Sequence, residues 1–223
     1  MTEQVFPSLH QNTLRVSVLN VIRESILNGT LKPGHQLVQA EIAAQMQISR
    51  APIREALRQL EEEGLVESVP YRGTFVSRIT RRDIRELYSL RGALEGLAVR
   101  LVIARSNERV STELEGILAE MWAAAEVGDY PALSAADLRF HTQLCLLSDH
   151  QRLIGSWKVN SNLIRRILSF RNRLNPATVV AEEHVPIVRA IRDRDEAAAR
   201  RAIEDHCVDS GEALASTWPD DED

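Results

Sequence analysis

The segment from Leu37 to Val76 constrains the fold of this chain more than any other part of the sequence. Small and apolar residues at helical spacing predict a short helix over 40–46, and a second apolar set with a period of about 3.6 residues predicts another helix over 50–63. Two strand-like stretches follow, 65–69 and 74–77, joined by a short glycine-containing turn. Helix, turn, helix and hairpin in this order predict a winged helix-turn-helix, a fold that binds double-stranded DNA.

The second helix of this segment has two distinct faces. Ser49 suits the N-cap, Pro52 suits the first turn, and Gly64 suits the position just after the last turn. An apolar stripe would pack inward, so arginines spaced four residues apart beside it would face outward, where arginine can bond guanine or clamp a phosphate. The residues expected to meet DNA lie on this helix and at the hairpin tip: Ser49, Arg50, Ala51, Pro52, Arg54, Arg58, Arg72 and Gly73.

An amphipathic helix with a solvated arginine face, followed by an ordinary hairpin, is the alternative interpretation. The arginine spacing alone does not exclude it. The complete order of cap, proline, arginine series, glycine stop and basic hairpin tip favours DNA binding.

In these positions the chain resembles the DNA-binding domain of the GntR family of bacterial transcription regulators. The resemblance covers about residues 11–78 and rests on Pro33-Gly34 with Leu37, Ser49 to Leu57, Leu60-Glu61, Glu63 to Val66 and Arg72 to Val76. It implies that Arg50 and Arg54 contact bases or nearby phosphates and that the hairpin tip enters the minor groove. Some members have an arginine where this chain has Ala40, so no operator sequence is carried over from the family.

The charge of the chain is divided unevenly. Its net charge is −5, yet residues 1–82 carry a net charge of +2 and residues 83–223 a net charge of −7. A basic head could approach phosphates while an acidic body stays away from them. We expect a cytoplasmic protein, because the sequence shows no secretion signal, no apolar run of membrane-spanning length and only two cysteines, Cys145 and Cys207.

Beyond residue 80 the periodicity predicts helices. Thr80 and Asp83 form a variant of the capping box, and the expected helices span 81–105, 109–127, 130–147, 150–172, 177–193 and 195–216. Six helices with short connections predict an antiparallel bundle. The fold class is therefore mainly α, an N-terminal winged helix-turn-helix followed by an all-α bundle.

The sequence divides into four parts on these grounds. They are a flexible N-terminus (1–10), the DNA-binding domain (11–78), the helical domain (79–217) and an acidic tail (218–223).

Four polar residues of the helical domain could share one metal ion. Asp137 and His141 are four residues apart, so they lie on one helix face, and antiparallel helices could bring His184 and His206 to the same level. Three nitrogens and one carboxylate oxygen would suit zinc, with nickel or manganese as alternatives. Spacing alone leaves open that these are ordinary surface or hydrogen-bonded side chains.

The helical domain resembles the FCD effector domain of the FadR-type branch of the same family. The resemblance rests on Asp137 to His141, Glu183-His184 with Ile187 and Ala190-Ile191, and Ala198 with His206. It implies a divalent metal held by an Asp and three His, a small carboxylate effector bound at the metal, and a cationic contact to that effector from Arg91. An ion pair between Arg91 and Glu95 within the bundle is the alternative for that arginine.

Two other classes of protein are alternatives. A metal-dependent enzyme lacks an evident acid–base residue beyond Glu183, which would point about 100° away from His184 on a helix. An architectural DNA binder would use the bundle for dimerisation alone. The sequence favours a regulator that is not an enzyme: a repressor that binds a palindromic operator as a homodimer and responds to a small carboxylate, with no membrane partner.

Overall fold

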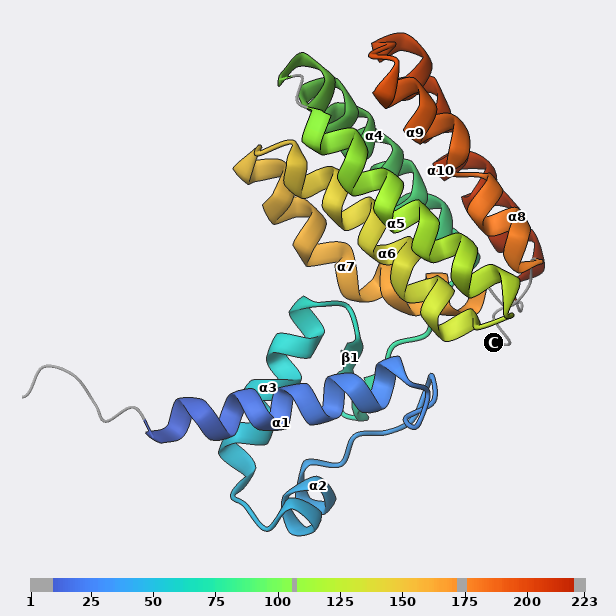
Figure 1. Cartoon of the computed structure of the whole chain (residues 1–223). Helices are drawn as coiled ribbons and strands as arrows, with labels where there is room; N and C mark the ends of the chain where they lie inside the picture. Colours follow the sequence, from blue (N-terminus) through green and yellow to red (C-terminus); the bar gives the residue numbers. More distant parts are fainter. Residues whose placement is uncertain (1–9, 106–107, 172–175, 219–223) are drawn as a thin grey trace, which may run out of the picture. The chain divides into compact units, whose positions relative to one another are not determined.

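The computed structural model describes residues 10–105, 108–171 and 176–218. Contacts divide the chain into two compact units, Met1–Ile79 and Thr80–Asp223. The first contains a small helical head with a two-stranded wing and the second a bundle of helices (Figure 1). Both parts of the predicted fold class are therefore confirmed.

The elements of the first unit are α1 (His10–Leu27), α2 (Gln39–Met46), α3 (Arg50–Glu62), β1 (Val66–Val69) and β2 (Gly73–Val76). The two strands pair antiparallel, with Val66 opposite Val76 and Val69 opposite Gly73. Gln36 adds an isolated bridge to Phe75, so the chain before α2 also lies along the wing. Gly64 follows Glu63, the C-cap of α3, and takes a left-handed φ of +69°, as its predicted role requires.

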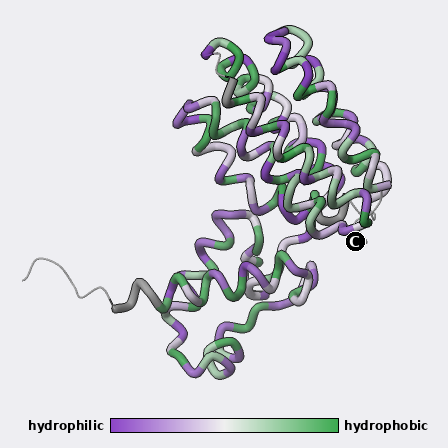
Figure 2. Tube along the Cα trace, in the orientation of Figure 1, coloured by the Kyte–Doolittle hydropathy of each residue, from purple (hydrophilic) through white to green (hydrophobic). Residues whose placement is uncertain are grey.

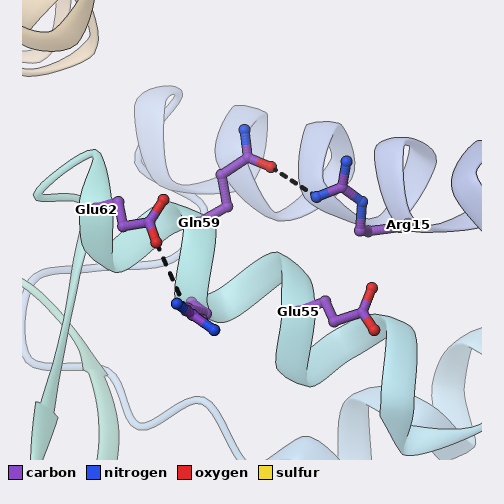
Figure 3. A pocket seen from close by; sticks show the side chains of 5 residues that line it. Arg15, Glu55, Gln59 and Glu62 are labelled. Carbon is purple, nitrogen blue, oxygen red and sulfur yellow. Dashed lines mark hydrogen bonds and ion pairs between the residues drawn. The ribbon is translucent and has the colours of Figure 1, made fainter.

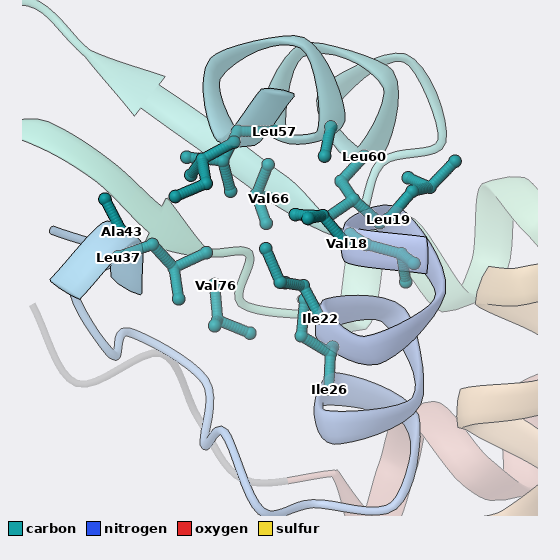
Figure 4. Packing of buried hydrophobic residues seen from close by; sticks show 13 residues of the cluster. Val18, Leu19, Ile22, Ile26, Leu37, Ala43, Leu57, Leu60, Val66 and Val76 are labelled. Atoms are coloured by element: carbon teal, nitrogen blue, oxygen red, sulfur yellow. The ribbon is translucent and has the colours of Figure 1, made fainter. Parts of the chain in front are cut away.

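A single hydrophobic cluster holds the head together (Figure 4). It joins residues from every element of this unit: Val18, Leu19, Ile22, Ile26, Leu37, Ala43, Ile53, Ala56, Leu57, Leu60, Leu65, Val66 and Val76. The four apolar residues expected on the inner side of α3 are all among them. At the rim, Arg23 of α1 makes two hydrogen bonds to the Glu63 carboxylate, at 2.6 and 2.9 Å, and so ties α1 to the end of α3.

The second unit consists of α4 (Arg81–Arg105), α5 (Glu108–Glu126), α6 (Tyr130–Leu147), α7 (Gln151–Arg171), α8 (Ala177–Glu182), α9 (Val185–Arg192) and α10 (Glu196–Thr217). Hydrophobic and hydrophilic residues alternate along each long helix, as helices with one buried side require (Figure 2). α10 packs against α4 and α9, while α6 packs against α4, α5 and α7.

The contact between α4 and α10 is very close. A Cβ atom on Gly211 of α10 would lie 2.6 Å from Cβ of Tyr88 on α4, so only glycine fits there. The predicted capping box is present at the start of α4, because the Thr80 N–H donates to the Asp83 carboxylate and the Asp83 N–H donates to the Thr80 hydroxyl.

The expected helix over 177–193 is wrong in one respect, since it is two helices, α8 and α9, separated at Glu183 and His184. Pro186 lies in the first turn of α9. Its ring supplies no N–H for a hydrogen bond to the Glu182 carbonyl in the preceding turn, so a continuous helix would lose that bond. The described part of the bundle therefore has seven helices rather than six, and His184 takes the N-cap position of α9.

Ser49 and the two ends of the chain complete the comparison with the expected elements. Ser49 occupies the N-cap of α3, but its side chain makes no capping hydrogen bond within the described part of the chain. The flexible N-terminus and the acidic tail lie outside the described residues, apart from His10, where α1 begins, and Trp218. Among the described helices, none combines the length and the apolar character needed to cross a bilayer.

The head core gives a stability prediction. Leu60 is fully buried, so Leu60→Ala should lower the free energy of opening of α3 by about 2–5 kcal/mol, the usual cost of removing a buried leucine side chain. Native-state amide hydrogen exchange in α3 measures this quantity. Val21→Ala is the matched control, since Val21 is 54% exposed and should change it little. Equal effects of the two substitutions would contradict the packing described.

Candidate metal centre and nucleic-acid interface

The exposed side of α3 carries the arginines that the sequence assigns to DNA. Arg50, Arg54 and Arg58 are exposed, as are Ser49 and Ala51, while Pro52 is half-buried. Among the described residues, Arg50 and Arg54 have no ion-pair partner. Their guanidinium groups are therefore available to a ligand that approaches the N-terminal half of α3.

Arg58 differs from the other two arginines. Its Nε lies 3.5 Å from Oε1 of Glu62, and it lines a pocket between α1 and α3 together with Arg15, Glu55 and Gln59 (Figure 3). Both partners of this ion pair are well exposed, so the pair adds little stability. It does offset the charge of Arg58, which leaves the positive charge of α3 concentrated at Arg50 and Arg54.

The tip of the wing is formed by exposed residues. Tyr71 has a left-handed φ of +63° and is fully exposed, and Arg72 and Gly73 beside it are exposed as well. Gln36 donates a hydrogen bond of 2.8 Å to the Arg72 carbonyl, which fixes the base of the tip. Sequence reasoning did not single out Tyr71; a large aromatic residue inside a predicted turn is the signal that could have found it.

In the bundle, the structure brings the four predicted metal ligands together. Ligand atoms of His141 on α6, His184 before α9 and His206 on α10 all lie within 4.8 Å of one another. Oδ1 of Asp137 lies 3.1 Å from Nε2 of His141 and 3.4 Å from Nε2 of His184, and these two nitrogens are 3.3 Å apart. Ligand atoms around a tetrahedral zinc with bonds of about 2.0–2.1 Å are separated by about 3.3 Å, so these three donors fit such an ion.

Hydrogen bonds on the outer sides of the imidazole rings orient this cluster. Nδ1 of His184 lies 2.8 Å from the Val180 carbonyl, and Nδ1 of His141 lies 2.5 Å from Oε2 of Glu95. Both partners only accept hydrogen bonds, so each Nδ1 carries a proton. Each Nε2 can present a lone pair to a metal once the proton that it directs at Asp137 is lost. Three buried histidines arranged in this way could hold a metal ion.

His206 completes the group from α10. Its ring stacks on that of His141, with centroids 5.3 Å apart, and its Nδ1 lies 3.7 Å from Oε2 of Glu183. The expectation that Glu183 points away from the cluster assumed a continuous helix; the break before α9 instead places its carboxylate beside His206.

Arg91 is buried next to the cluster. It is 1% exposed, its Nε donates to Oε1 of Glu95 at 3.0 Å, and its guanidinium carbon lies over the rings of Tyr88 and Trp157. The ion pair with Glu95, the alternative that the sequence leaves open for Arg91, is therefore present. Nη2 of Arg91 is buried and has no hydrogen-bond partner among the residues that the structure describes.

The buried charges stabilise one another. Burial opposes ionisation of Glu95, but His141 and Arg91 hold the pKa of its carboxyl below the usual value. Burial likewise opposes ionisation of Asp137, but hydrogen bonds with His141 and His184 hold its pKa well below the usual range. Burial raises the pKa of the Cys145 thiol, so Cys145 is an uncharged core residue and not a thiolate ligand.

Glu95 is the site residue that sequence reasoning missed, since it entered only as a partner for Arg91. The spacing of Glu95 relative to its apolar and buried neighbours could have indicated that it is buried. Tyr88, Arg91, Glu95 and Val102 follow one another at spacings typical of a buried helix face. A carboxylate within such a stripe needs a buried partner.

Comparison with known families matches both parts of the chain. Residues 14–76 match the family described as bacterial regulatory proteins, gntR family, and residues 86–209 match the FCD domain. The chain belongs to the GntR family, with a C-terminal FCD domain. The members of this family are transcriptional regulators and not enzymes.

Named relatives support this membership, and a solved structure shares the fold. The chain is 33% identical over 198 residues to a "probable D-xylose utilization operon transcriptional repressor" of Paenarthrobacter nicotinovorans, covering 89% of this chain and 87% of the relative. It is 27% identical to the HTH-type transcriptional repressor RspR of Escherichia coli (strain K12) over 88% of this chain and 87% of that one. A GntR regulator structure from Rhodococcus sp. RHA1 shares the fold, with a TM-score of 0.76 and 24% identity, covering 93% of this chain and all of that one.

The head gives a prediction for DNA binding. Arg54→Ala should weaken binding to a selected double-stranded site by about 1–3 kcal/mol, because one exposed arginine contact is lost. Fluorescence anisotropy with labelled DNA at fixed salt measures it. Arg200→Ala, an exposed arginine of α10 that is paired with Glu204, is the control and should leave the affinity unchanged. The same loss in both variants would remove Arg54 from the interface.

The cluster gives a prediction for metal content. His184→Ala should lower the zinc content of the purified protein, measured by elemental mass spectrometry, because one of the proposed ligands is lost. With zinc removed from both proteins, the variant should bind DNA with an affinity within about twofold of that of the wild type. His35→Ala is the matched control, because His35 is an exposed histidine of the head. Unchanged zinc in the His184 variant would show that the cluster is not a metal site.

Proposed function

We propose that this protein is a transcriptional repressor whose affinity for its operator is set by a small organic acid bound beside a divalent metal ion in the helical domain. The observation that carries the proposal is the buried group of Asp137, His141, His184 and His206 next to Arg91, within a chain that also has a DNA-binding head. Repression is inferred from relatives that are named repressors.

Zinc is the metal that the donor set favours, with nickel and manganese as alternatives. When bound, the ion would supply a Lewis-acidic centre for the oxygens of a carboxylate. Arg91 would supply the cationic contact, since its Nη2 is buried and its Nε is already bonded to Glu95. A buried N–H donor without a partner is costly, and a carboxylate oxygen would satisfy it with a charge-assisted hydrogen bond.

At the head, Arg50 and Arg54 would read bases or clamp phosphates in the major groove, with Ser49, Ala51 and Pro52 beside them and Arg58 at the margin. Arg72 and Gly73 at the wing tip would lie against the neighbouring groove. Two chains paired through their helical domains would place two such heads on a palindromic operator.

The connection between the two functions would run along α10. This helix carries His206, and Trp218 directly after it accepts two hydrogen bonds from the Arg81 guanidinium, at 2.9 and 3.1 Å. Arg81 begins α4, two residues after the first unit ends at Ile79. A ligand that favours one position of α10 against α4 would therefore shift the residues that connect the wing to α4. The free energy of DNA binding would then change by the coupling free energy between the two sites.

The ligand proposal is tested by thermal unfolding of the zinc-loaded protein with succinate and with citrate. A bound acid at about 100 times its Kd should add about 2.7 kcal/mol to the free energy of unfolding and raise Tm accordingly. Arg91→Met should reduce this shift and retain zinc, because Arg91 bonds Glu95 and none of the four donors.

Arg85→Met is the control, since Arg85 lies on the same helix and pairs with Glu212 at an exposed site. It should keep the full shift. An absence of any shift across a wider panel of carboxylates would support the architectural alternative, in which the bundle only dimerises.

A further inference from the structure

Glu95 lies at the centre of the buried polar group, although it is neither a metal donor nor an anion contact. It is fully buried on α4, and both of its oxygens are used. Oε1 accepts a hydrogen bond from Nε of Arg91 at 3.0 Å, and Oε2 lies 2.5 Å from Nδ1 of His141. One carboxylate thus joins the proposed anion contact on α4 to a proposed metal ligand on α6.

The orientation of His141 depends on this carboxylate. A neutral imidazole carries a proton on one nitrogen only, and the hydrogen bond made by one nitrogen decides which atom can bind a metal. For His184 the outer partner is a backbone carbonyl, that of Val180, which no substitution removes. For His141 the same task falls to a side chain from another helix.

We infer that Glu95 is a positioning residue that fixes the Nδ1–H form of His141 and holds the Arg91 guanidinium beside the same site. This inference rests on the proposed metal site. The Glu95 carboxylate would thus position both His141, a proposed metal ligand, and Arg91, the proposed anion contact. Because His141 lies on α6 and the other two residues on α4, both contacts would depend on how α4 packs against α6.

An amide in place of the carboxylate cannot perform both tasks. If the oxygen of a glutamine faces Arg91, its NH₂ group faces Nδ1 of His141 and favours the form whose Nε2 carries the proton. If the oxygen faces His141, the NH₂ group faces the N–H of Arg91, and two donors oppose each other. Glu95→Gln has nearly the same shape as the native side chain, so it tests the acceptor role rather than the packing.

The experiment is a zinc titration of the full-length protein against a competing chelator at constant pH. Glu95→Gln should weaken zinc binding by about 10- to 100-fold, the usual effect of removing an outer hydrogen-bond partner of a metal ligand. Glu212→Gln is the matched control, because Glu212 also pairs with an arginine of α4, Arg85, but at an exposed site. It should leave zinc affinity unchanged.

Glu95→Gln also leaves Arg91 buried without its counter-charge, which can prevent folding. The pair Arg91→Met and Arg91→Met/Glu95→Leu avoids this, because both members lack the buried cation. Leucine offers His141 no acceptor, whereas a glutamine oxygen could accept from Nδ1 of His141 once the Arg91 donor is gone. The double variant should bind zinc about 10- to 100-fold more weakly than Arg91→Met alone. Equal affinity of these two proteins would overturn the inference.

A double-mutant cycle with His141→Ala separates positioning from a general structural effect. If Glu95 acts through His141, Glu95→Gln should cause little further loss once His141 is absent. An equal loss with and without His141 would overturn the inference while leaving the metal site intact. A wild-type protein that takes up no zinc would instead overturn the proposed metal site, and this inference with it.

Discussion

The helical domain is organised around charges that it removes from water. Arg91, Glu95, Asp137 and His141 are all at most 1% exposed. Each buried ion costs several kcal/mol in lost hydration, and good geometry with several partners is what offsets that cost. Here the Glu95 carboxylate contacts Arg91 and His141, and the Asp137 carboxylate contacts His141 and His184. These contacts therefore hold α4, α6 and the start of α9 against one another. Removing the charge of one of these residues should destabilise its buried partners.

The head is built on the opposite principle. Its interior is wholly apolar in the cluster that joins α1, α3 and the wing, and its charged residues lie outside. The pairing of Arg58 with Glu62 leaves the first half of α3 as its most positive part. A rigid apolar core with free arginines at one helix end suits a surface that must fit a groove without rearranging. The bundle, by contrast, keeps charged and polar groups inside, where the proposed carboxylate would meet them.

Much of this architecture follows from the sequence, and the reasons for the remainder are specific. The inner stripe of α3, the stop at Gly64 and the capping box of Thr80 and Asp83 are local patterns, so periodicity and capping chemistry predicted them. The break before α9 was missed because the apolar repeat continues across it and hides the effect of Pro186.

The proposed metal ligands were predictable only in part. The same-face relation of Asp137 and His141 is local, but nothing in the spacing shows that His184 and His206 approach them from other elements. The resemblance to the FCD domain supplied that step. The role of Glu95 depends on the meeting of α4 and α6, which is a property of the folded bundle and not of either helix.

Control of DNA binding by the proposed acid site can be measured as a change in operator affinity. A palindromic site would be selected from random DNA with the zinc-loaded protein, and its Kd measured at one salt concentration with and without a saturating carboxylate that binds the bundle. If the two sites are coupled, the Kd should change by about 5- to 150-fold, the usual range for coupled sites. An unchanged Kd, with the carboxylate shown to be bound, would contradict this coupling.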